Sequence, residues 1–223
     1  MEITPIAHIR TDFGSKFGVP RQSGVVEELR AKIVFEPAYR NPDALRGLTD
    51  FSHLWLIWHF SEVKQEGWSP TVRPPRLGGN ARMGVFATRS PYRPNPIGLS
   101  SVKIVGIDLA TPDGPVITVA GADLMDGTPI FDIKPYLAYA DSHPDAKGGF
   151  IDGLTDRSVQ VRCDESLLSS LSEETRVSLL AVLAHDPRPT YQNDPERVYG
   201  MEFAGHNVRF TVADGVLTVV EIA

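Results

Sequence analysis

The sequence of 223 residues has a single cysteine, Cys163, so it cannot form an internal disulfide framework or a cysteine-based zinc site. It also lacks a long apolar run, because its most hydrophobic window, residues 54–60, is far too short to span a bilayer. The N-terminal stretch MEITPIAHIR has no basic segment followed by an apolar one, which predicts no signal peptide. We therefore expect a cytoplasmic protein with no membrane association, in which Cys163 is a reduced thiol on a half-buried strand.

Several familiar catalytic signatures are also missing. No GxGxxG opens a helix after a strand, and no Walker motif, HExxH or GxSxG occurs. The six histidines show no metal-ligand spacing, so we expect no metal site and interpret them as structural or surface residues. These absences remove support from nucleotide hydrolysis, metalloprotease and serine hydrolase functions.

Acidic residues are absent from one block of the chain. The whole chain has a net charge of −6, yet residues 67–107 contain no Asp or Glu. Six basic residues give this block a charge of +6, and the other 182 residues, with 16 basic against 28 acidic, carry −12. Such asymmetry indicates an anionic ligand, although single arginines could pair with acidic residues elsewhere. The six are Arg73, Arg76, Arg82, Arg89, Arg93 and Lys103.

Glycine and proline, at 19 and 18 residues, are too frequent for a helical bundle and favour short strands joined by structured loops. No helical pattern separates the apolar alternations, which disfavours a doubly wound parallel sheet. We predict a mainly β protein whose N-terminal part, residues 1–142, is a small antiparallel β-barrel. The predicted strands are residues 3–9, 29–35, 51–60, 84–88, 101–109 and 116–121.

A second, smaller α+β domain is predicted over residues 150–223, after a linker at 141–149. It would contain a strand at 158–162 and a hairpin around Asp214-Gly215, which joins residues 207–212 to 216–222. Ser172 is the expected N-cap of a helix that runs to about His185. The apolar face predicted for this helix consists of Val177, Leu180, Ala181 and Ala184.

Long loops rich in Pro, Gly and Arg lie between the predicted strands, at 18–24, 66–82, 90–98 and 123–136, and loops of this length are usually functional. Within 90–98 three prolines fix the backbone, so the stiff loop presents Arg89, Arg93 and Asn95 in a preset geometry. The tight turn expected at 126–129 would by itself be equally consistent with plain structure.

Five motifs in order resemble one family: PRQSG at 20–24, RGLTDFSHLW at 46–55, WSPTVRPPRLGGNARMGVFATRSPYRPNPIGLS at 68–100, DLMDGTPIFDIKPY at 123–136 and DPRPTY at 186–191. Over nearly the whole chain they resemble the TsaA/TrmO-like family of S-adenosylmethionine-dependent tRNA methyltransferases. The resemblance implies a homodimeric β-barrel enzyme. It would methylate the exocyclic N6 of N6-threonylcarbamoyladenosine at position 37 of threonine tRNA. The alternative is a cofactor-binding or RNA-binding barrel without catalysis.

The resemblance also implies a binding site for S-adenosylmethionine. Carboxylates such as Glu62 or Asp126 suit the cationic parts of the cofactor or its ribose hydroxyls, and Arg21 or Arg89 suits its carboxylate. Ser61 departs from the family pattern, in which a larger polar side chain is usual, so we expect a backbone contact there. The implied cofactor-binding residues are Pro20, Arg21, Gln22, Ser61, Glu62, Arg89, Leu99, Asp126, Gly127, Thr128 and Pro129.

For catalysis the acceptor nitrogen must lose its proton, so a general base or a hydrogen-bond donor near it is expected. Asp132, Lys134 and Tyr136 are the candidates by type and neighbourhood, with a salt-bridged turn as the structural alternative. Asn95 is expected to bind the adenine edge, and Arg93 to pair with the threonyl carboxylate of the substrate.

The anticodon loop of the tRNA would be held through phosphates and stacked bases. Arg73, Arg76 and Arg82 are the expected phosphate contacts, and Arg93 is also counted with the RNA-binding set. Arg188 and Tyr191 would add an arginine and a stacking ring, although Arg188 could instead belong to a turn that ends the helix and anchors the two domains.

Overall fold

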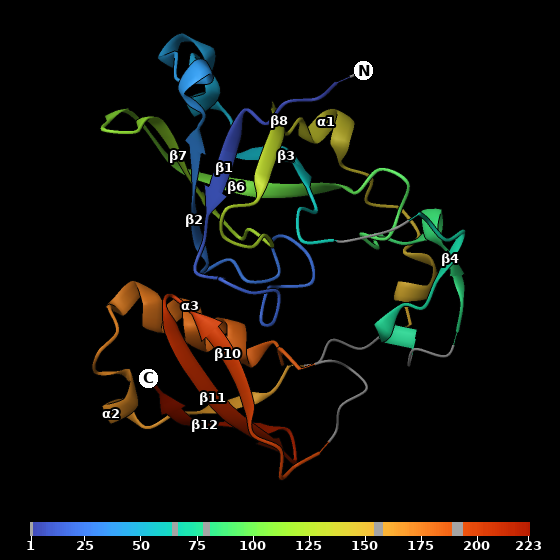
Figure 1. Cartoon of the computed structure of the whole chain (residues 1–223), viewed down its shortest axis with the longest axis vertical. Coiled ribbons are helices and arrows are strands. Elements are labelled where there is room, and N and C mark those ends of the chain that lie inside the picture. The colour runs from blue at the N-terminus through green and yellow to red at the C-terminus, as the bar shows by residue number, and fades with distance from the viewer. Residues whose placement is uncertain (1, 64–66, 78–80, 154–157, 189–193) are drawn as a thin grey trace.

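The computed structural model describes residues 2–63, 67–77, 81–153, 158–188 and 194–223 (Figure 1). The strands of the N-terminal part are β1 (Ala7–Arg10), β2 (Arg30–Phe35), β3 (His53–His59), β4 (Thr71–Val72), β5 (Met83–Gly84), β6 (Ile97–Thr111), β7 (Gly114–Ala120) and β8 (Pro129–Pro135). The remaining elements are α1 (Ala138–Asp141), β9 (Gln160–Arg162), α2 (Glu165–Leu168), α3 (Glu173–Ala184), β10 (Tyr199–Phe203), β11 (His206–Ala213) and β12 (Val216–Ile222).

Six strands close into a barrel in the order β1-β2-β7-β6-β3-β8, and every neighbouring pair is antiparallel. The mainly β prediction with an N-terminal barrel is therefore confirmed. Alternation explains the inward face, because every second residue of β2 and β3 is buried. Short 3₁₀ helices connect the strands, at Pro37–Tyr39, Pro42–Leu45, Leu48–Asp50, Pro75–Leu77 and Val85–Ala87.

The barrel departs from the prediction at four places. Residues 85–87 form a 3₁₀ turn where a strand was predicted at 84–88, with Val85 buried and the Thr88 hydroxyl bonded to the Val85 carbonyl at 2.9 Å. The predicted strand at 3–9 is confined to β1, and β6 begins four residues before its predicted start. A whole strand, β8, lies inside the segment 123–136 that was predicted to be a loop.

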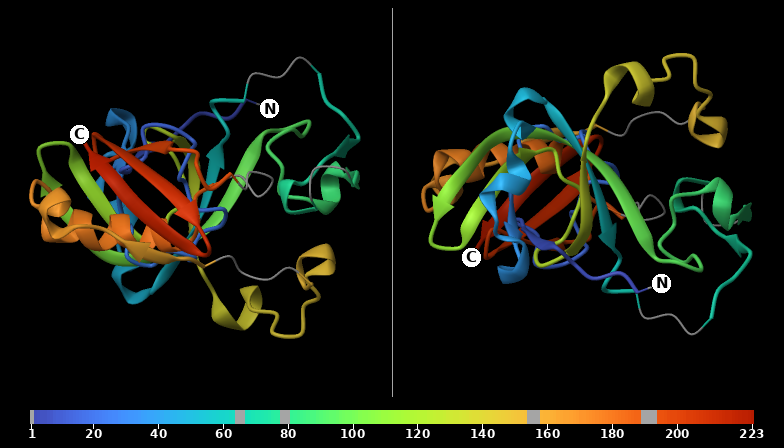
Figure 2. Two further views of the ribbon diagram at one scale, coloured as in Figure 1. Left: turned by 90° about the horizontal axis from the view of Figure 1, so that it is seen from below. Right: turned by 90° about the horizontal axis from the view of Figure 1, so that it is seen from above.

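The C-terminal part is a four-stranded sheet in the order β10-β11-β12-β9, in which only β12 and β9 are parallel among the described residues. The predicted hairpin is confirmed, with Asp214 and Gly215 at φ angles of 50° and 76°. Strand β10 was not predicted. Figures 1 and 2 show α3 lying between this sheet and the loops of the barrel.

Helix α3 starts where it was predicted, because the Ser172 side chain accepts a hydrogen bond from the Thr175 amide at 3.2 Å. The predicted apolar face was right only in part, because Leu180 and Ala181 pack against the C-terminal core but are only partly buried. Val177 is 49% exposed, whereas the buried apolar residues are Leu179, Val182 and Leu183. The helix is apolar on most sides, so its packing partners rather than its periodicity decide which face is covered.

The segment 11–29 joins the two halves of the molecule. Three of its side chains, Phe13, Val26 and Leu29, belong to the apolar core of the C-terminal part. Phe13 packs edge-on against Phe203, with ring centroids 5.3 Å apart. The Asp12 carbonyl accepts from the Ala204 amide at 2.8 Å, and the Glu28 carbonyl accepts from the Ser178 hydroxyl at 3.0 Å. The barrel keeps a separate core of its own.

Asp141 fixes the start of the predicted linker. Its carboxylate accepts from the Leu137 amide at 2.8 Å and from the Trp55 indole at 2.9 Å, and these bonds lower its pKa.

In the described part of the chain, no helix combines the length and apolar character needed to cross a membrane. Burial raises the pKa of the Cys163 thiol, which disfavours the reactive thiolate.

Candidate functional site

A cleft of about 670 Å³ opens at one end of the barrel, a size typical of small-molecule sites. Four segments line it, within residues 16–22, 58–63, 88–99 and 123–128, and all four belong to the motifs or loops singled out from the sequence or lie beside them. The predicted site residues that line this cleft are Pro20, Arg21, Gln22, Ser61, Glu62, Arg89, Arg93, Asn95, Leu99 and Thr128.

The proline-rich loop holds its shape through its own side chains. Nη1 of Arg93 donates to the carbonyls of Thr88 and Ser90 at 3.1 and 3.4 Å, and the Tyr92 amide donates to the Ser90 hydroxyl at 3.2 Å. These bonds use two of the five guanidinium donors of Arg93. The loop is therefore held rigid while Arg93 and Asn95 still line the cleft.

Arg21 and Gln22 connect three parts of the molecule beside the cleft. Arg89 Nη1 donates to Gln22 Oε1, and Gln22 Nε2 donates to the Arg21 carbonyl. Arg21 Nη2 in turn donates to the Arg188 carbonyl at 3.1 Å. The proline-rich loop, the segment 20–22 and the C-terminal part are thus joined by one chain of hydrogen bonds.

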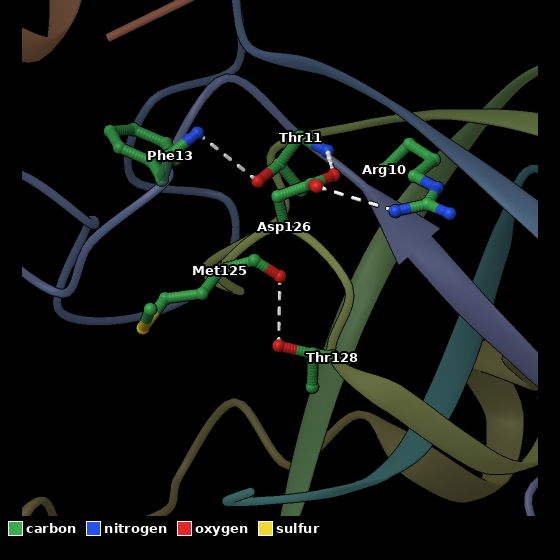
Figure 3. Close-up of polar contacts among 6 residues, drawn as sticks. All are labelled: Arg10, Thr11, Phe13, Met125, Asp126 and Thr128. Atoms are coloured by element: carbon green, nitrogen blue, oxygen red, sulfur yellow. Dashed lines mark hydrogen bonds and ion pairs between the residues drawn. The ribbon is translucent and has the colours of Figure 1, made fainter. Parts of the chain in front are cut away.

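The predicted turn at 126–129 is confirmed as a turn, but most of it faces away from the cleft. The Asp126 carboxylate accepts from the Thr11 amide at 3.0 Å and lies 3.4 Å from Arg10 Nη1 (Figure 3). The Thr128 hydroxyl donates to the Met125 carbonyl at 2.8 Å. Of the four residues predicted here, Thr128 lines the cleft, whereas Asp126, Gly127 and Pro129 do not.

The inner part of the cleft contains a polar relay on an apolar base. The Trp58 indole donates to the Ser100 hydroxyl at 3.0 Å, and Ser100 donates to Asp123 Oδ1 at 2.6 Å. Ser100 is only 1% exposed. Burial raises the pKa of Asp123, while hydrogen bonds from Ser100 and backbone amides and the charge of Arg89 act in the opposite direction.

Gly98 is required where β6 passes under the Trp58 ring. A Cβ atom at this position would lie 2.2 Å from Cε2 of Trp58, so the ring or the strand would have to move. We expect Gly98→Ala to lower the free energy of unfolding by about 1–3 kcal/mol, the usual cost of overpacking. Urea unfolding measures this. Gly106→Ala, on the same strand with no atom within 4 Å, is the control, and equal losses in the two variants would contradict the contact.

Asp132 and Lys134 on β8, and Tyr136 directly after it, were predicted to be catalytic but do not line the cleft. Asp132 and Lys134 pair with Ile57 and Trp55 of β3 and form an ion pair of 2.8 Å on the outer surface of the barrel. The Tyr136 ring packs against Trp55, with centroids 5.6 Å apart. Asn95 is the one predicted catalytic residue among the described residues that line the cleft.

The predicted RNA-binding residues divide into two groups. Arg73 and Arg82 are exposed on the extension formed by β4 and β5, and Arg82 Nε donates to the Thr71 hydroxyl at 2.9 Å. Arg76 falls in the turn Pro75–Leu77, but its side chain lies outside the described structure, as does Tyr191 altogether. Figure 1 shows the extension standing away from the barrel.

Arg188 is a structural residue rather than an exposed phosphate contact. Its side chain is 9% exposed, and its Nε and Nη2 atoms donate to the two oxygens of Asp186 at 2.8 and 2.9 Å. Because the guanidinium is buried and already paired, the prediction that it contacts RNA is not supported. The alternative, a turn after α3 that anchors the two halves, agrees with its bond to Arg21.

Comparison with known proteins decides the family. Residues 8–142 match the model of the tRNA-methyltransferase O N-terminal domain, and residues 156–223 match that of the TrmO C-terminal domain. The chain belongs to the TrmO family. It is 42% identical over 217 residues to the tRNA (adenine(37)-N6)-methyltransferase of Escherichia coli K12, which covers 94% of this chain and 92% of the relative.

Other members of the TrmO family agree. The protein of the same name from Eikenella corrodens is 46% identical over 170 residues, covering 76% of this chain and 95% of the relative. The crystal structure of TrmO from Pseudomonas aeruginosa superposes with a TM-score of 0.79 at 30% identity, covering 100% of this chain and 98% of the other. The similarity therefore extends over both halves of the fold.

Several residues of this TrmO-family cleft were not predicted as site residues. Trp58 lies in a predicted apolar strand and Asp123 in the 123–136 motif. No sequence pattern indicated that Ser100 links their side chains by hydrogen bonds. An aromatic pair was also missed on the extension, where the rings of Trp68 and Phe86 stack at 6.1 Å while being 53% and 72% exposed. The other unpredicted residues that line the cleft include Lys16, Val19, Thr88, Tyr92, Leu124 and Met125.

Proposed function

We propose that this protein is a methyltransferase that uses S-adenosylmethionine to methylate N6 of adenosine 37 in tRNA. The observation that carries the proposal is that residues of the family motifs, from four separate segments of the chain, line one cleft. The relatives named tRNA (adenine(37)-N6)-methyltransferase and the relatives named S-adenosylmethionine-dependent methyltransferases support it. We further propose that N6-threonylcarbamoyladenosine in threonine tRNA is the substrate.

The residues of the cleft fit the chemistry of this cofactor. Trp58, Phe60 and Leu124 supply an apolar surface for its nucleoside part and for the carbon groups beside its sulfur. Arg89 supplies a cation for its carboxylate, and Glu62 is an exposed carboxylate at the rim. When bound, S-adenosylmethionine supplies an electrophilic methyl group on a sulfonium.

The chain must then orient the acceptor adenine and assist loss of its proton. We propose that Asn95, which lines the cleft on the proline-rich loop, hydrogen-bonds the adenine edge. Arg93 also lines the cleft and retains donors for the substrate carboxylate. Holding the nucleophile in line accounts for much of the expected acceleration. Asp132, Lys134 and Tyr136 remain our candidates for proton removal or charge stabilisation.

A homodimer would reconcile these candidates with their position. In one subunit Asp132 and Lys134 lie on the outer face of β8, and Tyr136 follows the strand; none of the three lines the cleft. A symmetric dimer can bring the outer surface of one subunit against the cleft of the other. We therefore propose a cytoplasmic homodimer with sites shared between subunits.

The proposed activity is tested directly. The protein is incubated with S-adenosylmethionine and threonine tRNA, with and without the threonylcarbamoyl group, and the nucleosides are analysed by mass spectrometry. A methylated product only from the modified tRNA supports the full proposal. Product from both tRNAs removes the threonylcarbamoyl requirement. Binding of cofactor and tRNA without product would favour the alternative, a binding module without catalysis.

The extension that carries Arg73 and Arg82 is proposed to contact the tRNA backbone. Each lost phosphate contact is expected to reduce the salt dependence of binding, by about 0.7–0.9 in the slope of log K against log salt. Arg73→Ala with Arg82→Ala should therefore lower that slope by about 1.5 and weaken binding roughly tenfold at moderate salt. Filter binding from low to moderate salt measures both quantities.

A matched control removes the same charge elsewhere. Lys32 and Arg162 are exposed and lie outside the basic block. The double variant Lys32→Ala with Arg162→Ala is expected to keep the salt slope of the unchanged protein. An equal change of slope in both double variants would show that net charge, rather than the extension, determines RNA affinity.

A further inference from the structure

Asp123 is the acidic residue held most firmly inside the cleft. The Trp58 indole can only donate, so its bond at 3.0 Å makes the Ser100 hydroxyl an acceptor and directs the Ser100 hydrogen to Asp123 Oδ1 at 2.6 Å. Trp58 and Ser100 are 7% and 1% exposed, so neither can turn away easily. The backbone amide of Ser23 also bonds this carboxylate. The Asp123 side chain is therefore fixed in one orientation.

The hydrogen bond from Ser100 does not by itself require a negative charge at this position. An asparagine oxygen would accept the Ser100 hydrogen bond equally well, without the cost of burying an ionised group. Burial raises the pKa of Asp123, because removing the carboxylate from water outweighs its hydrogen bonds and the charge of Arg89. Among the described residues, no cationic group forms an ion pair with Asp123 at 4 Å or less. A cationic ligand would compensate this charge.

The cationic partner of the cleft lies nearby. Arg89 is close enough for its charge to act on Asp123, and both residues line the cleft. One anion beside one cation is the complement of a zwitterionic α-amino acid, in which an ammonium and a carboxylate share one carbon. An ammonium offers three N–H donors for charge-assisted bonds, whereas a sulfonium offers none.

We propose that Asp123 binds the α-ammonium of the amino-acid portion of the cofactor, with Arg89 taking the carboxylate. This inference rests on the proposed function, because it specifies how the cleft recognises S-adenosylmethionine. Trp58 and Ser100 are then positioning residues, which act only through the orientation of the Asp123 carboxylate.

The test compares two ligands that differ in the amino-acid portion. S-adenosylhomocysteine carries it, and 5′-methylthioadenosine has the same nucleoside and thioether without it. Calorimetric titration of Asp123→Asn is expected to show a loss of about 10- to 100-fold in affinity for S-adenosylhomocysteine. This is the loss expected when one charge-assisted hydrogen bond is removed. Affinity for 5′-methylthioadenosine should stay within about twofold, because the substituted side chain keeps its shape.

Two further variants make the test selective. If Ser100 acts by positioning Asp123, Ser100→Ala should lower the affinity for S-adenosylhomocysteine by a smaller factor, roughly threefold to tenfold. The affinity for 5′-methylthioadenosine should not change. Asp12→Asn removes the same charge from a half-buried carboxylate that does not line the cleft, and should change neither affinity. Thermal melting of each variant shows that it is folded.

The outcomes separate this inference from the proposed function. If the unchanged protein binds S-adenosylhomocysteine but Asp123→Asn binds it equally well, the assignment of the ammonium is wrong while the cofactor site stands. If Asp123→Asn loses affinity for both ligands by the same factor, Asp123 supports binding of the nucleoside part or the shape of the cleft, and the assignment is again wrong. If the unchanged protein binds neither ligand, both proposals fail.

Discussion

Replacement of Asp186 by alanine is expected to lower the free energy of unfolding by about 3–5 kcal/mol, the cost of leaving one member of a buried ion pair alone. The side chains of Asp186 and Arg188 are 5% and 9% exposed, and two parallel bonds of 2.8 and 2.9 Å join them. Without the carboxylate, the Arg188 guanidinium would remain buried with no anion beside it. Urea unfolding at neutral pH measures the loss.

A companion variant separates charge from backbone strain. Asp186 has a φ angle of 45°, in the left-handed region that alanine tolerates poorly and asparagine accepts more readily. Asp186→Asn should therefore retain most of the destabilisation if the lost charge causes it. Removing both charges, with Asp186→Asn and Arg188→Met, should recover stability relative to Asp186→Asn, since the unpaired buried charge is gone.

An exposed pair supplies the control. Arg209 and Glu221 are also 2.8 Å apart, but their side chains are 49% and 48% exposed. Glu221→Gln is expected to cost less than about 1 kcal/mol, as is usual for ion pairs at the surface. If Asp186→Asn cost no more than Glu221→Gln, the Asp186–Arg188 pair would be hydrated in solution and the anchoring role of Arg188 would be contradicted.

Lys134→Ala and Tyr136→Phe are expected to reduce the single-turnover rate of methyl transfer by about 100-fold if they assist proton removal from the acceptor nitrogen, at the low end of general acid–base contributions. Lys134 lies on the outer face of β8, where it pairs with Asp132 at 2.8 Å, and Tyr136 follows the strand and packs against Trp55. Stability should change little, because Lys134 is 60% exposed as a side chain. Rapid-quench measurements with saturating cofactor and tRNA isolate the chemical step.

Subunit mixing tests whether this face serves a partner's cleft. Lys134→Ala protein and Arg89→Ala protein would each have low activity, because one lacks the β8 face and the other the cleft. A random mixture of subunits should regain about a quarter of the full activity, since half of the dimers are mixed and each has one intact site. No recovery on mixing would place both functions in one subunit. Full rates for both single variants would assign Lys134 and Tyr136 to structure alone.

The barrel could be predicted from the sequence largely because its strands alternate. Ala31, Ile33 and Phe35 were assigned to one face of a strand, and all three belong to the barrel core, whereas Leu29, assigned to the same face, precedes β2 and joins the C-terminal core. Strand β8 was missed for a physical reason: Asp132 and Lys134 point outward, and prolines stand at both of its ends, so the strand has the composition of a loop. Its pairing with β1 and β3, which no local pattern contains, makes it a strand.

The candidate site was predicted in part because its motifs are local, whereas its geometry is not. The sequence placed Arg21, Gln22 and Arg89 in one site, and they are now joined by hydrogen bonds. The sequence also grouped Asp126 with this site. Its contacts with Arg10 and Thr11 could not be predicted from a local pattern, because they form only when the end of β1 packs against the turn. The role of Asp123 required knowing that Trp58 and Ser100 converge from two strands.

The sharing of Phe13, Val26 and Leu29 with the C-terminal core has an evolutionary consequence. A protein that kept this barrel but lost the sheet β10-β11-β12-β9 would leave these three large apolar side chains facing water. Those positions and the C-terminal sheet should therefore be inherited together. In relatives without the sheet, the same three positions should be polar or covered by some other added segment.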